Sequence, residues 1–576
     1  MILVFGGTTE GRKVVEVLED AGSIYYYSTK TGEQDITLHH GQRIDGALDE
    51  DAMLTFCREH GIRIIVNAAH PFASQLHETI MQVSEALDTP VVRYERIYPP
   101  RDPSITWIDN YSKVPLDIHS LLATTGVQSI GKLKYLEKRG VKVVYRILNR
   151  ESSIALAHQQ GATDDQLCFY PETVAAEAIL MKESGESGGF SEKIAEAKEN
   201  GMRIIVLKRP VVTQRNRPYC VNGPYGLRRA IEKLLPEFYP LHSGLTTGTC
   251  ATAAAVAAAI RLLKNEMPSE VPVLLPNGET IQVPVGYGNG FAYCIKEAGD
   301  DPDVTNGLEI RVRVELSDTL EIHGGEGVGR FTLPGFDYPP GEAAINKAPR
   351  EMIRKNLDRL TTVNNQLSIT ISVPAGEEIA RRTFNPRLGI EGGISIIGVS
   401  GIVKPFSEEA FIDSIRKCMT VAKASGSERV VINSGGKSER YVKALYPNLP
   451  PQAFVEYGNY IGETLKIAHE LDIKNVTLGV MLGKAVKLAA GHLDTHSRKA
   501  TMDKEFIGQM LNEAECMADL EEITLARELW QVIPQDKIEN FCHVVLKHCL
   551  KYCCPLVPNS HLTLLLIDDG GTIHSL

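Results

Sequence analysis

The sequence predicts a multidomain α/β protein, and three observations lead to this prediction. The chain has 576 residues and a mass of 63.3 kDa, several times the length of about 100 to 200 residues that one domain usually has. Hydrophobic residues make up 43% and charged residues 23%, which is ordinary globular composition. Short β-branched runs alternate with helical patterns from the first residue, which is typical of parallel α/β units. We therefore expect three or four domains.

The first 240 residues are expected to form two lobes of this kind. In the first lobe the pattern predicts strands at residues 2–5, 23–27, 63–66 and 90–94, with helices at 12–20, 51–60 and 74–87. In the second lobe it predicts strands at 127–130, 141–147, 167–169 and 203–207, and a helix at 174–181. Strands that alternate with helices in this way predict parallel sheets covered on both faces.

A domain boundary is expected near residues 236–243, where two prolines and a glycine interrupt any period. The domains are therefore expected at residues 1–240 and 243–576. From residue 271 to about 373 the second part has strands and glycine turns, and from 390 to about 488 it returns to strand, glycine loop and helix. We expect an α+β lobe followed by an α/β lobe.

Charge and cysteine content narrow the class of protein. The 61 Lys and Arg residues against 72 Asp and Glu give a net charge of −11 and a pI near 5.9, so general attraction to nucleic acid or anionic lipid is not expected. The 11 scattered cysteines are typical of a reduced compartment. The N-terminus lacks the pattern of a signal peptide, and no apolar run reaches 18 residues. We expect a cytoplasmic protein with neither nucleic-acid nor membrane partners.

The first predicted strand runs into a glycine turn that is typical of a dinucleotide site. The turn and the helix start comprise Gly6, Gly7, Thr8, Thr9, Glu10, Gly11 and Arg12. Free N–H groups at such a helix start bind phosphate. The usual glycine at the third position is Thr8 here, and a tight turn without ligand is the alternative. After the second strand, Ser28, Thr29 and Lys30 replace the usual acid, which favours NADPH over NADH.

Two further loops of this half hold candidate substrate groups. His70 follows the third strand, where it could donate a proton or a hydrogen bond to substrate. Packing is the alternative role for His70. Lys182, Ser184 and Gly185 begin a glycine-rich segment with one cation, which is a candidate substrate loop or a surface turn.

Four segments of this half, taken together, resemble a known family. They are GGTTEGR, NAAHPFA, the TTG of residues 124–126 and KESGESGGFSEK. In this order they resemble the precorrin-6A reductases of cobalamin biosynthesis, over residues 1 to about 240. The family usually has Asp-Ala-Thr-His-Pro where this chain has Asn67-Ala68-Ala69-His70-Pro71. The resemblance implies hydride transfer from a nicotinamide to a ring-contracted tetrapyrrole, in a cleft between two Rossmann-like lobes.

The second half begins with hydroxyl and acidic candidates. Thr246, Thr247 and Thr249 precede an alanine-rich helix, and their hydroxyls with the helix N-terminus could bind a carboxylate. An N-capped helix is the alternative. Asp300 and Asp301 lie in the acidic loop of residues 299–303. The loop could bind a cation, orient basic groups, take part in proton transfer or form a capped turn, and we predict no metal site there.

Glycine-rich turns at strand ends predict a nucleoside cofactor site in the last lobe. The candidate residues are Gly389, Gly392, Gly393, Gly435, Gly436, Gly458 and Asn459. Arg387 and Lys404 flank the first of these turns and are candidates for binding substrate carboxylates. In the tail, Cys542, Cys549 and Cys553 would share one helix face, which fits core packing better than a metal site.

This half resembles the cobalt-precorrin-5B (C(1))-methyltransferases. The matching segments include GLTTGTCATAA, KEAGDDPDVTNG, GEGVGRFT, RLGIEGGISIIGVSGIVKP and GKAVKLAAGHLDTHS, collinear over residues 243 to about 505. The resemblance implies S-adenosylmethionine as the methyl donor and a cobalt-precorrin as the acceptor. In-line positioning and exclusion of water then matter more than a protein nucleophile.

Together the two resemblances predict a bifunctional enzyme of cobalamin biosynthesis. It would methylate cobalt-precorrin-5B to cobalt-precorrin-6A and reduce that product to cobalt-precorrin-6B with NADPH or NADH. The alternative is a methyltransferase whose reductase-like half is inactive and only binds substrate, because Asn67 and Ala69 depart from the family pattern. The oligomeric state stays open, with a homodimer as one option.

Overall fold

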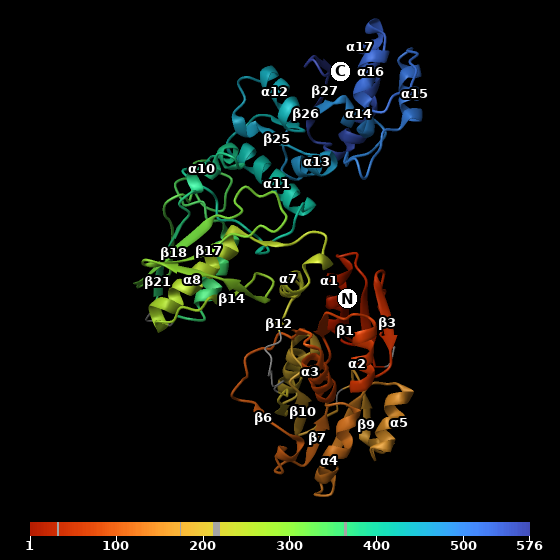
Figure 1. Ribbon diagram of the computed structural model, residues 1–576, viewed down its shortest axis with the longest axis vertical. Helices are drawn as coiled ribbons and strands as arrows, with labels where there is room; N and C mark the ends of the chain where they lie inside the picture. The colour runs from red at the N-terminus through yellow and green to blue at the C-terminus, as the bar shows by residue number, and fades with distance from the viewer. Residues whose placement is uncertain (31–33, 173, 211–218, 362–365) are drawn as a thin grey trace. The chain divides into compact units, whose positions relative to one another are not determined.

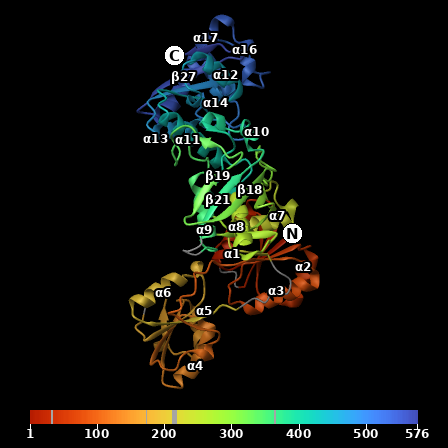
Figure 2. The ribbon, with the colours of Figure 1, turned by 90° about the vertical axis from the view of Figure 1, so that its left-hand side faces the viewer.

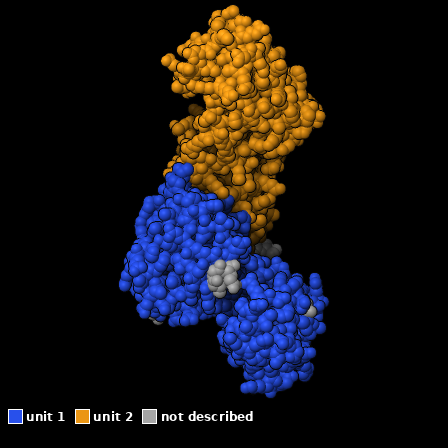
Figure 3. Space-filling view, turned by 90° about the vertical axis from the view of Figure 1, so that its right-hand side faces the viewer, with its two compact units in different colours: residues 1–242, 277–282 blue, residues 243–276, 283–576 orange. Residues whose placement is uncertain are grey.

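The computed structural model describes residues 1–30, 34–172, 174–210, 219–361 and 366–576. These residues form two compact units, coloured separately in Figure 3. Unit 1 comprises residues 1–242 and 277–282, and unit 2 comprises residues 243–276 and 283–576. Each unit is described by itself.

Unit 1 begins with a parallel six-stranded sheet in the order β12-β5-β4-β1-β2-β3. Counted from β3, this is the 3-2-1-4-5-6 order of a Rossmann sheet. The strand order therefore changes direction between β1 and β4. The strands are β1 (Ile2–Phe5), β2 (Tyr25–Thr29), β3 (Gly41–Asp45), β4 (Ile64–Asn67), β5 (Val91–Tyr94) and β12 (Tyr219–Val221).

Helices cover both faces of this first sheet (Figure 1). On one face, α1 (Thr9–Glu19) and α7 (Pro224–Leu234) pack against side chains such as Val4 and Val66. On the other face, α2 (Glu50–Glu59) and α3 (Ser74–Leu87) pack against Leu3 and Ile65. Because β1 and β4 bury every residue, they read as continuous apolar runs rather than as an alternation.

The second sheet of unit 1 is inserted in the chain between β5 and β12. It is parallel and has the order β6-β11-β10-β7-β8-β9, so its strand order changes direction between β7 and β10. Figure 2 shows α4 (Ile130–Glu137) and α6 (Phe190–Glu199) on either side of it; α5 is Glu151–Gln159. The strands are β6 (Thr106–Ile108), β7 (Ser120–Ala123), β8 (Lys142–Ile147), β9 (Leu167–Phe169), β10 (Ala178–Lys182) and β11 (Arg203–Leu207).

Two predicted elements of this lobe are wrong. Residues 127–130 form a 3₁₀ turn, Val127–Ser129, and the first residue of α4 instead of a strand. Ile130, Leu133 and Leu136 are buried at helical spacing, so Ile130 belongs to the apolar face of α4 and does not end a strand. The helix expected at 174–181 is also absent, since residues 178–181 belong to the strand β10, which is apolar on both faces and rich in residues that also favour helices.

Unit 2 begins with an α+β lobe built on a five-stranded sheet. The sheet order is β16-β17-β18-β21-β19, and α8 (Thr247–Lys264) packs on β17 and β18 and against α9 (Lys347–Leu357). Thirteen consecutive residues of α8, from Thr247 to Ala259, are buried. The alanines let helix and sheet approach closely. The strands are β16 (Gly286–Gly288), β17 (Phe291–Ile295), β18 (Glu309–Ser317), β19 (Glu321–Gly324) and β21 (Gln366–Ser372).

The last lobe has a five-stranded sheet in the order β25-β24-β26-β27-β28. All neighbours are parallel except the β27–β28 pair, and the order changes direction between β24 and β26. On one side α12 (Gly436–Leu445) covers the sheet, and on the other α11 (Glu408–Ala424), α13 (Ile461–Glu470), α14 (Leu482–Ala489) and α17 (Ile538–Cys553) pack together. The strands are β24 (Val430–Asn433), β25 (Phe454–Glu456), β26 (Asn475–Met481), β27 (His561–Ile567) and β28 (Ile573–Ser575).

The cysteine-rich tail is part of this core. Cys542, Cys549 and Cys553 of α17 are fully buried in the core shared with α14, and burial raises the pKa of Cys542 to about 12. Among the described residues, no cluster of three or more histidine, cysteine or acidic side chains could hold a metal ion. No helix in the described part of the chain is both long and apolar enough to cross a membrane.

Candidate functional sites

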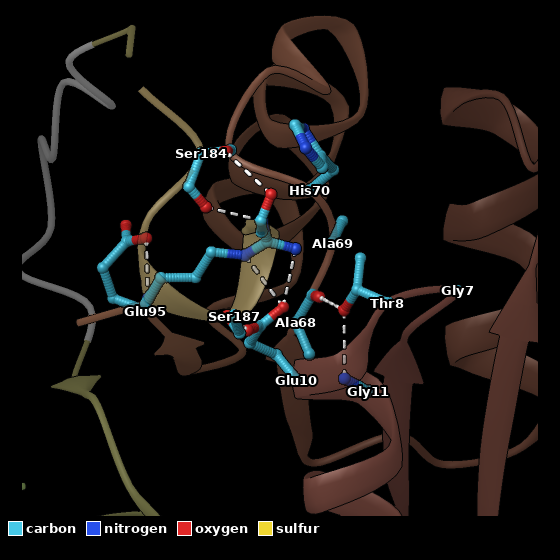
Figure 4. Close-up of polar contacts among 12 residues, drawn as sticks. Gly7, Thr8, Glu10, Gly11, Ala68, Ala69, His70, Glu95, Ser184 and Ser187 are labelled. Atoms are coloured by element: carbon cyan, nitrogen blue, oxygen red, sulfur yellow. Dashed lines mark hydrogen bonds and ion pairs between the residues drawn. The ribbon is translucent and has the colours of Figure 1, made fainter. Parts of the chain in front are cut away.

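The glycine turn of unit 1 lies where the strand order of the first sheet changes direction. Thr8 is the N-cap of α1, and its hydroxyl accepts a hydrogen bond from Gly11 N at 3.0 Å. The same hydroxyl donates to the carbonyl of Ala68, at 2.7 Å (Figure 4). Thr8 therefore joins the loop after β1 to the loop after β4. A crevice at such a point is where α/β sheets bind ligands.

The glycines of this turn have two different roles. A Cβ at Gly6 or Gly11 would lie 2.1 Å and 2.5 Å from the Tyr27 hydroxyl, so these two are glycines because Tyr27 packs beneath the turn. Gly7 has φ +83°, and a Cβ there would have no atom within 4 Å. The Gly7 N–H itself donates to the Tyr27 hydroxyl at 3.2 Å and to Gln34 Oε1 at 3.1 Å. The open side of the turn is therefore the Cα side of Gly7, beside a helix N-terminus, which leaves room for a phosphate. Thr9 and Arg12 are exposed beside it.

Beside the end of β2 lies an acid of the neighbouring strand that sequence reasoning did not place there. Ser28 and Thr29 are buried, and the Thr29 hydroxyl donates to Asp45 Oδ1 at 3.1 Å. Asp45 ends the neighbouring strand β3 and pairs with Arg43 at 2.9 Å. Lys30 is exposed. A ribose bound here would meet the carboxylate of Asp45 as well as the cation of Lys30. The carboxylate opposes a 2′-phosphate, so the structure favours NADPH over NADH less than the sequence alone does.

The loop that carries His70 is fixed by a buried hydrogen-bond network. Arg93 donates to Asn67 Oδ1 at 3.0 Å and to the Ala69 carbonyl at 2.9 Å. Asn67 Nδ2 lies 3.0 Å from His77 Nδ1, and His77 Nε2 lies 3.0 Å from the His70 carbonyl. The amide must donate to Nδ1, so the proton of His77 is on Nε2. Asn67 thus fits a neutral His77. Burial and the charge of Arg93 lower the pKa of His77 to about 4.

His70 itself is neutral at physiological pH. Burial, followed by the charges of Arg96 and Lys182, lowers its pKa to about 4. Its Nδ1 accepts a hydrogen bond from Phe72 N at 3.2 Å, so its proton is on Nε2. His70 can therefore donate a neutral hydrogen bond, whereas an imidazolium general acid is not available at pH 7.

Glu10 is held by the second lobe of the same unit. Its carboxylate accepts a hydrogen bond from Arg96 Nε at 2.9 Å and another from the Ser187 hydroxyl (Figure 4). Both side chains of the Glu10–Arg96 pair are about 95% buried, with 4% and 5% exposed. Burial alone would raise the pKa of Glu10, but Ser187 and Arg96 outweigh it and lower that pKa. We therefore assign Glu10 to joining the lobes rather than to cofactor contact.

The glycine-rich segment after β10 packs against the same arginine. The carbonyl of Ser184 accepts a hydrogen bond from Arg96 NH1 at 2.7 Å. A Cβ at Gly185, which has φ +72°, would lie 2.9 Å from the Arg96 Cβ. Ser184 and Gly185 are buried. Their positions are explained by packing, which leaves Lys182 as the member of this segment that faces a ligand space.

Lys182 lines a cavity of about 700 Å³ in unit 1. Five cations and one carboxylate, Asp109, are among its lining residues. Arg101 and Arg209 pair with Glu183, and Lys208 pairs with Asp109. Among the described residues Lys132 and Lys182 form no ion pair; each lies over an aromatic ring, Tyr111 and Phe72 respectively.

The electrostatics of this cavity favour an anionic ligand. Burial, followed by the charges of Lys132 and Lys193, lowers the pKa of Lys182. A carboxylate in the cavity would relieve this repulsion. The cavity lies at the carboxyl ends of β10 and β11, and the loop after β4 contributes Phe72 and Ser74. Sequence reasoning did not identify Lys132 or Arg209, because Lys132 lies in the first turn of α4 and Arg209 follows β11, and neither belongs to a recognisable motif.

In unit 2 the predicted threonine site is used within the protein. Thr247 Oγ1 accepts from Ile397 N at 2.8 Å, and Thr249 Oγ1 donates to the Gly401 carbonyl at 2.6 Å. Thr246 caps α8 by accepting from Thr249 N at 3.2 Å. These hydroxyls are at most 9% exposed. We therefore assign them to holding residues 395–401 against α8, and a ligand carboxylate has no free hydroxyl there.

The acidic loop of residues 299–303 is organised around a buried lysine. Asp303 pairs with Lys296, which is 2% exposed, at 2.6 Å. Burial would raise the pKa of Asp303, but Lys296 and Thr305 lower it. Asp301 Oδ1 accepts from Phe406 N at 3.0 Å. Asp300 and Asp301 stay predictions as catalytic groups, because the structure assigns the loop's strongest interaction to Asp303.

The turn at residues 389–393 packs closely against the chain segment of residues 327–333. A Cβ at Gly393 would lie 2.1 Å from the Gly327 carbonyl oxygen, and one at Gly389 would lie 2.4 Å from Leu333. Gly392 has φ +81° and open space around it. Beside this turn Arg387 pairs with Glu439 at 2.9 Å, while Lys404 is exposed. Gly392 and Lys404 are thus the members of this set that face solvent.

The glycine turns of the last lobe lie together at the carboxyl ends of three strands. Gly435 and Gly436, with φ +83° and +51°, connect β24 to α12, and Gly436 has open space around it. Gly458 follows β25, and the carbonyl of Asn459 accepts from Thr495 N at 3.0 Å. Lys484, at the start of α14, donates to the Gly458 carbonyl. Sequence reasoning grouped the glycines but did not single out Glu456 beside them.

Comparisons with known proteins match both halves of the chain. Residues 1–222 match the family model "Precorrin-6x reductase CbiJ/CobK", and residues 236–405 match the family model CbiD. A cobalt-precorrin-5B C(1)-methyltransferase of Prosthecochloris aestuarii is 41% identical over 350 residues, which are 57% of this chain and 95% of that protein.

Two solved structures also match. One is a cobalamin biosynthesis protein (cbiD) from Archaeoglobus fulgidus, with 32% identity, 45% of this chain and 83% of that chain covered, and a TM-score of 0.26. The other is a CobK precorrin-6A reductase, with 16% identity, 41% and 96% covered, and a TM-score of 0.34.

The two family models and the 41% identical relative define the class of protein. It is an enzyme of cobalamin biosynthesis in which a reductase domain precedes a methyltransferase domain. The Rossmann sheet of unit 1, with its glycine turn, suits the first of these activities. The chain belongs to the cobalt-precorrin-5B C(1)-methyltransferase family and carries a precorrin-6x reductase (CbiJ/CobK) domain at its N-terminus.

Proposed function

We propose that the chain catalyses two successive steps. The second half would transfer a methyl group from S-adenosylmethionine to C(1) of cobalt-precorrin-5B, and the first half would reduce the resulting cobalt-precorrin-6A to cobalt-precorrin-6B with NADPH or NADH. The observation that carries the reductase proposal is the cavity beside Lys182, because unpaired cations suit a substrate with several acetate and propionate groups. The methyltransferase proposal is supported by the extended match to that family.

The reductase site needs a nucleotide and a tetrapyrrole side by side. The open space on the Cα side of Gly7 and the α1 N-terminus fit the pyrophosphate, and Asp45 with Thr29 fits the ribose. A bound nicotinamide supplies the hydride. In this proposal Lys132 and Lys182 hold substrate carboxylates, and the Nε2–H of His70 donates a hydrogen bond to the ring system.

The methyltransferase site is proposed at the carboxyl ends of β24, β25 and β26. Open space at Gly436 and the start of α12 fit a nucleoside. Bound S-adenosylmethionine supplies an electrophilic methyl group, so the chain must orient the acceptor carbon and exclude water. No protein nucleophile is needed for this transfer.

The test is an anaerobic incubation of the purified chain with cobalt-precorrin-5B, S-adenosylmethionine and each nicotinamide in turn. Mass spectrometry of the corrinoid should record a methyl gain followed by a two-hydrogen gain. A methyl gain alone would favour the alternative in which the first half only binds substrate. No change in the corrinoid would refute the proposal.

A further inference from the structure

The candidate nucleoside site in unit 2 contains a carboxylate that the protein does not use. Glu456 is the last residue of β25. Among the described residues, its carboxylate makes no hydrogen bond or ion pair, although the charges of Arg387, Glu439 and Lys484 act on it. The pKa of Glu456 is raised, mainly by burial and also by the negative charge of Glu439. The positive charges of Arg387 and Lys484 lower it, but by less. A half-buried carboxylate without a protein partner has lone pairs that a ligand can use.

The position of Glu456 relative to the glycine turn is specific. A Cβ built on Gly435 would lie 2.4 Å from Glu456 Oε1 and 2.8 Å from Oε2. The carboxylate therefore rests against the backbone of the turn that leads into α12. Any larger residue at Gly435 would displace it, so this glycine keeps both the turn and the acid in place.

The strand topology places Glu456 beside the end of β24, from which the glycine turn leads. The register pairs Asn433 at the end of β24 with Glu456 at the end of the neighbouring parallel strand β25. Glu456 also follows the glycine pair by about 20 residues, the spacing at which dinucleotide-binding units place an acid for the ribose hydroxyls. On the other side of β24, β26 completes the point where the strand order changes direction.

We infer that Glu456 binds the ribose hydroxyls of the adenosyl group, which makes it a cofactor-binding residue of the methyltransferase half. This inference rests on the proposed use of S-adenosylmethionine at this lobe. Each carboxylate oxygen can accept a hydrogen bond from one hydroxyl of the vicinal diol. The alternative role for Glu456 is attraction of the positive sulfonium, and this predicts a different dependence on the ligand.

The experiment compares three ligands and three forms of the full-length protein by isothermal titration calorimetry. The ligands are S-adenosylmethionine, S-adenosylhomocysteine, which lacks the sulfonium charge, and the 2′,3′-dideoxyribose analogue of S-adenosylhomocysteine. The proteins are the wild type, Glu456→Gln, and Glu409→Gln as a control at an exposed acid of α11. Thermal unfolding checks that both variants are folded.

The wild type and Glu409→Gln should bind the parent ligand roughly 10- to 100-fold more tightly than the analogue, the range for hydrogen bonds to a charged group. Glu456→Gln should lose most of this preference and bind the analogue as the wild type does. A folded Glu456→Gln variant that keeps the full preference would overturn the inference while leaving the proposed function intact. If Glu456→Gln lost affinity for S-adenosylmethionine but not for S-adenosylhomocysteine, Glu456 would be assigned to the sulfonium instead.

If the wild type binds none of the three ligands, the proposed function itself fails at this lobe.

Discussion

Removal of Arg96 should destabilise unit 1 strongly, because it would leave a buried carboxylate without its ion-pair partner. The side chains of Arg96 and Glu10 are 5% and 4% exposed. Breaking such a pair from one side costs about 3 to 5 kcal/mol, since the remaining charge stays desolvated. Arg96→Met should therefore lower the free energy of unfolding of unit 1 by roughly that amount.

A double variant shows how much of the destabilisation comes from the unpaired charge and how much from the lost side-chain volume. Glu10→Met with Arg96→Met replaces both buried charges by apolar side chains, and such a replacement is often close to neutral. We expect it to be more stable than Arg96→Met alone by about 2 kcal/mol or more, a coupling of the size that contacting residues show. Arg58→Met, at an exposed position of α2, is the control.

Tryptophan fluorescence can follow unit 1 in the intact chain. The protein has two tryptophans, Trp107 in unit 1 and Trp530 in unit 2. In a Trp530→Phe background, urea unfolding monitored at Trp107 reports on the unit that contains the pair. The reasoning would be refuted if Arg96→Met shifted the midpoint no more than Arg58→Met does.

The same pair predicts a pH dependence with a definite sign. The pKa of Glu10 in the folded protein lies below its ordinary value of 4.5, so the stabilisation it contributes is fully present above pH 4.5. It should be lost as the pH falls through the lower, folded value. The stability difference between the wild type and Glu10→Gln should therefore shrink under acidic conditions, and a difference that grows on acidification would contradict this assignment.

Three further predictions concern the two sites. Lys182→Met should raise the KM for the corrinoid in the reductase reaction roughly 10-fold or more by removing a carboxylate partner, whereas exposed Lys138→Met should not change KM. Asp45→Asn should shift the ratio of kcat/KM values several-fold toward NADPH, because a carboxylate beside the ribose repels a 2′-phosphate; an unchanged ratio would remove Asp45 from the cofactor site. Gly435→Ala should abolish methyl transfer by clashing with Glu456, while nicotinamide oxidation with supplied cobalt-precorrin-6A should continue at the wild-type rate.

Local pattern was enough to predict the elements whose sequence and environment agree. Residues 2–5 and 74–87 are the strand β1 and the helix α3 with the bounds expected from the sequence. The strand β10 was mistaken for a helix because a central strand is buried on both faces and loses the alternation that identifies it. The position of a strand within its sheet is a tertiary property, and the residues of β10 do not carry it.

The candidate sites likewise contain a part that local sequence predicts and a part that it does not. Glycine turns and helix starts are local, so the loop of residues 6–11 and Gly435 could be found from the sequence. The partners that give these loops their chemistry are distant: Arg96 lies 86 residues from Glu10, and Ser187 lies 177 residues from it. No sequence period connects such pairs, and the parallel topology alone brings them together.

Strand topology also separates the candidate residues that face a ligand space from those that serve packing. The loops after β1, β10 and β24 lie where a parallel sheet changes direction, so two neighbouring helices begin on opposite faces and leave a crevice between them. Gly7, Lys182 and Gly436 lie at such points and face space that the described residues leave open. Thr247 and Thr249 carry equally suitable groups, but their helix packs on a sheet that is mainly antiparallel and has no such crevice. Their hydroxyls therefore bond to the chain itself, and a residue type with the right chemistry becomes a candidate ligand only where the topology keeps a space for the ligand.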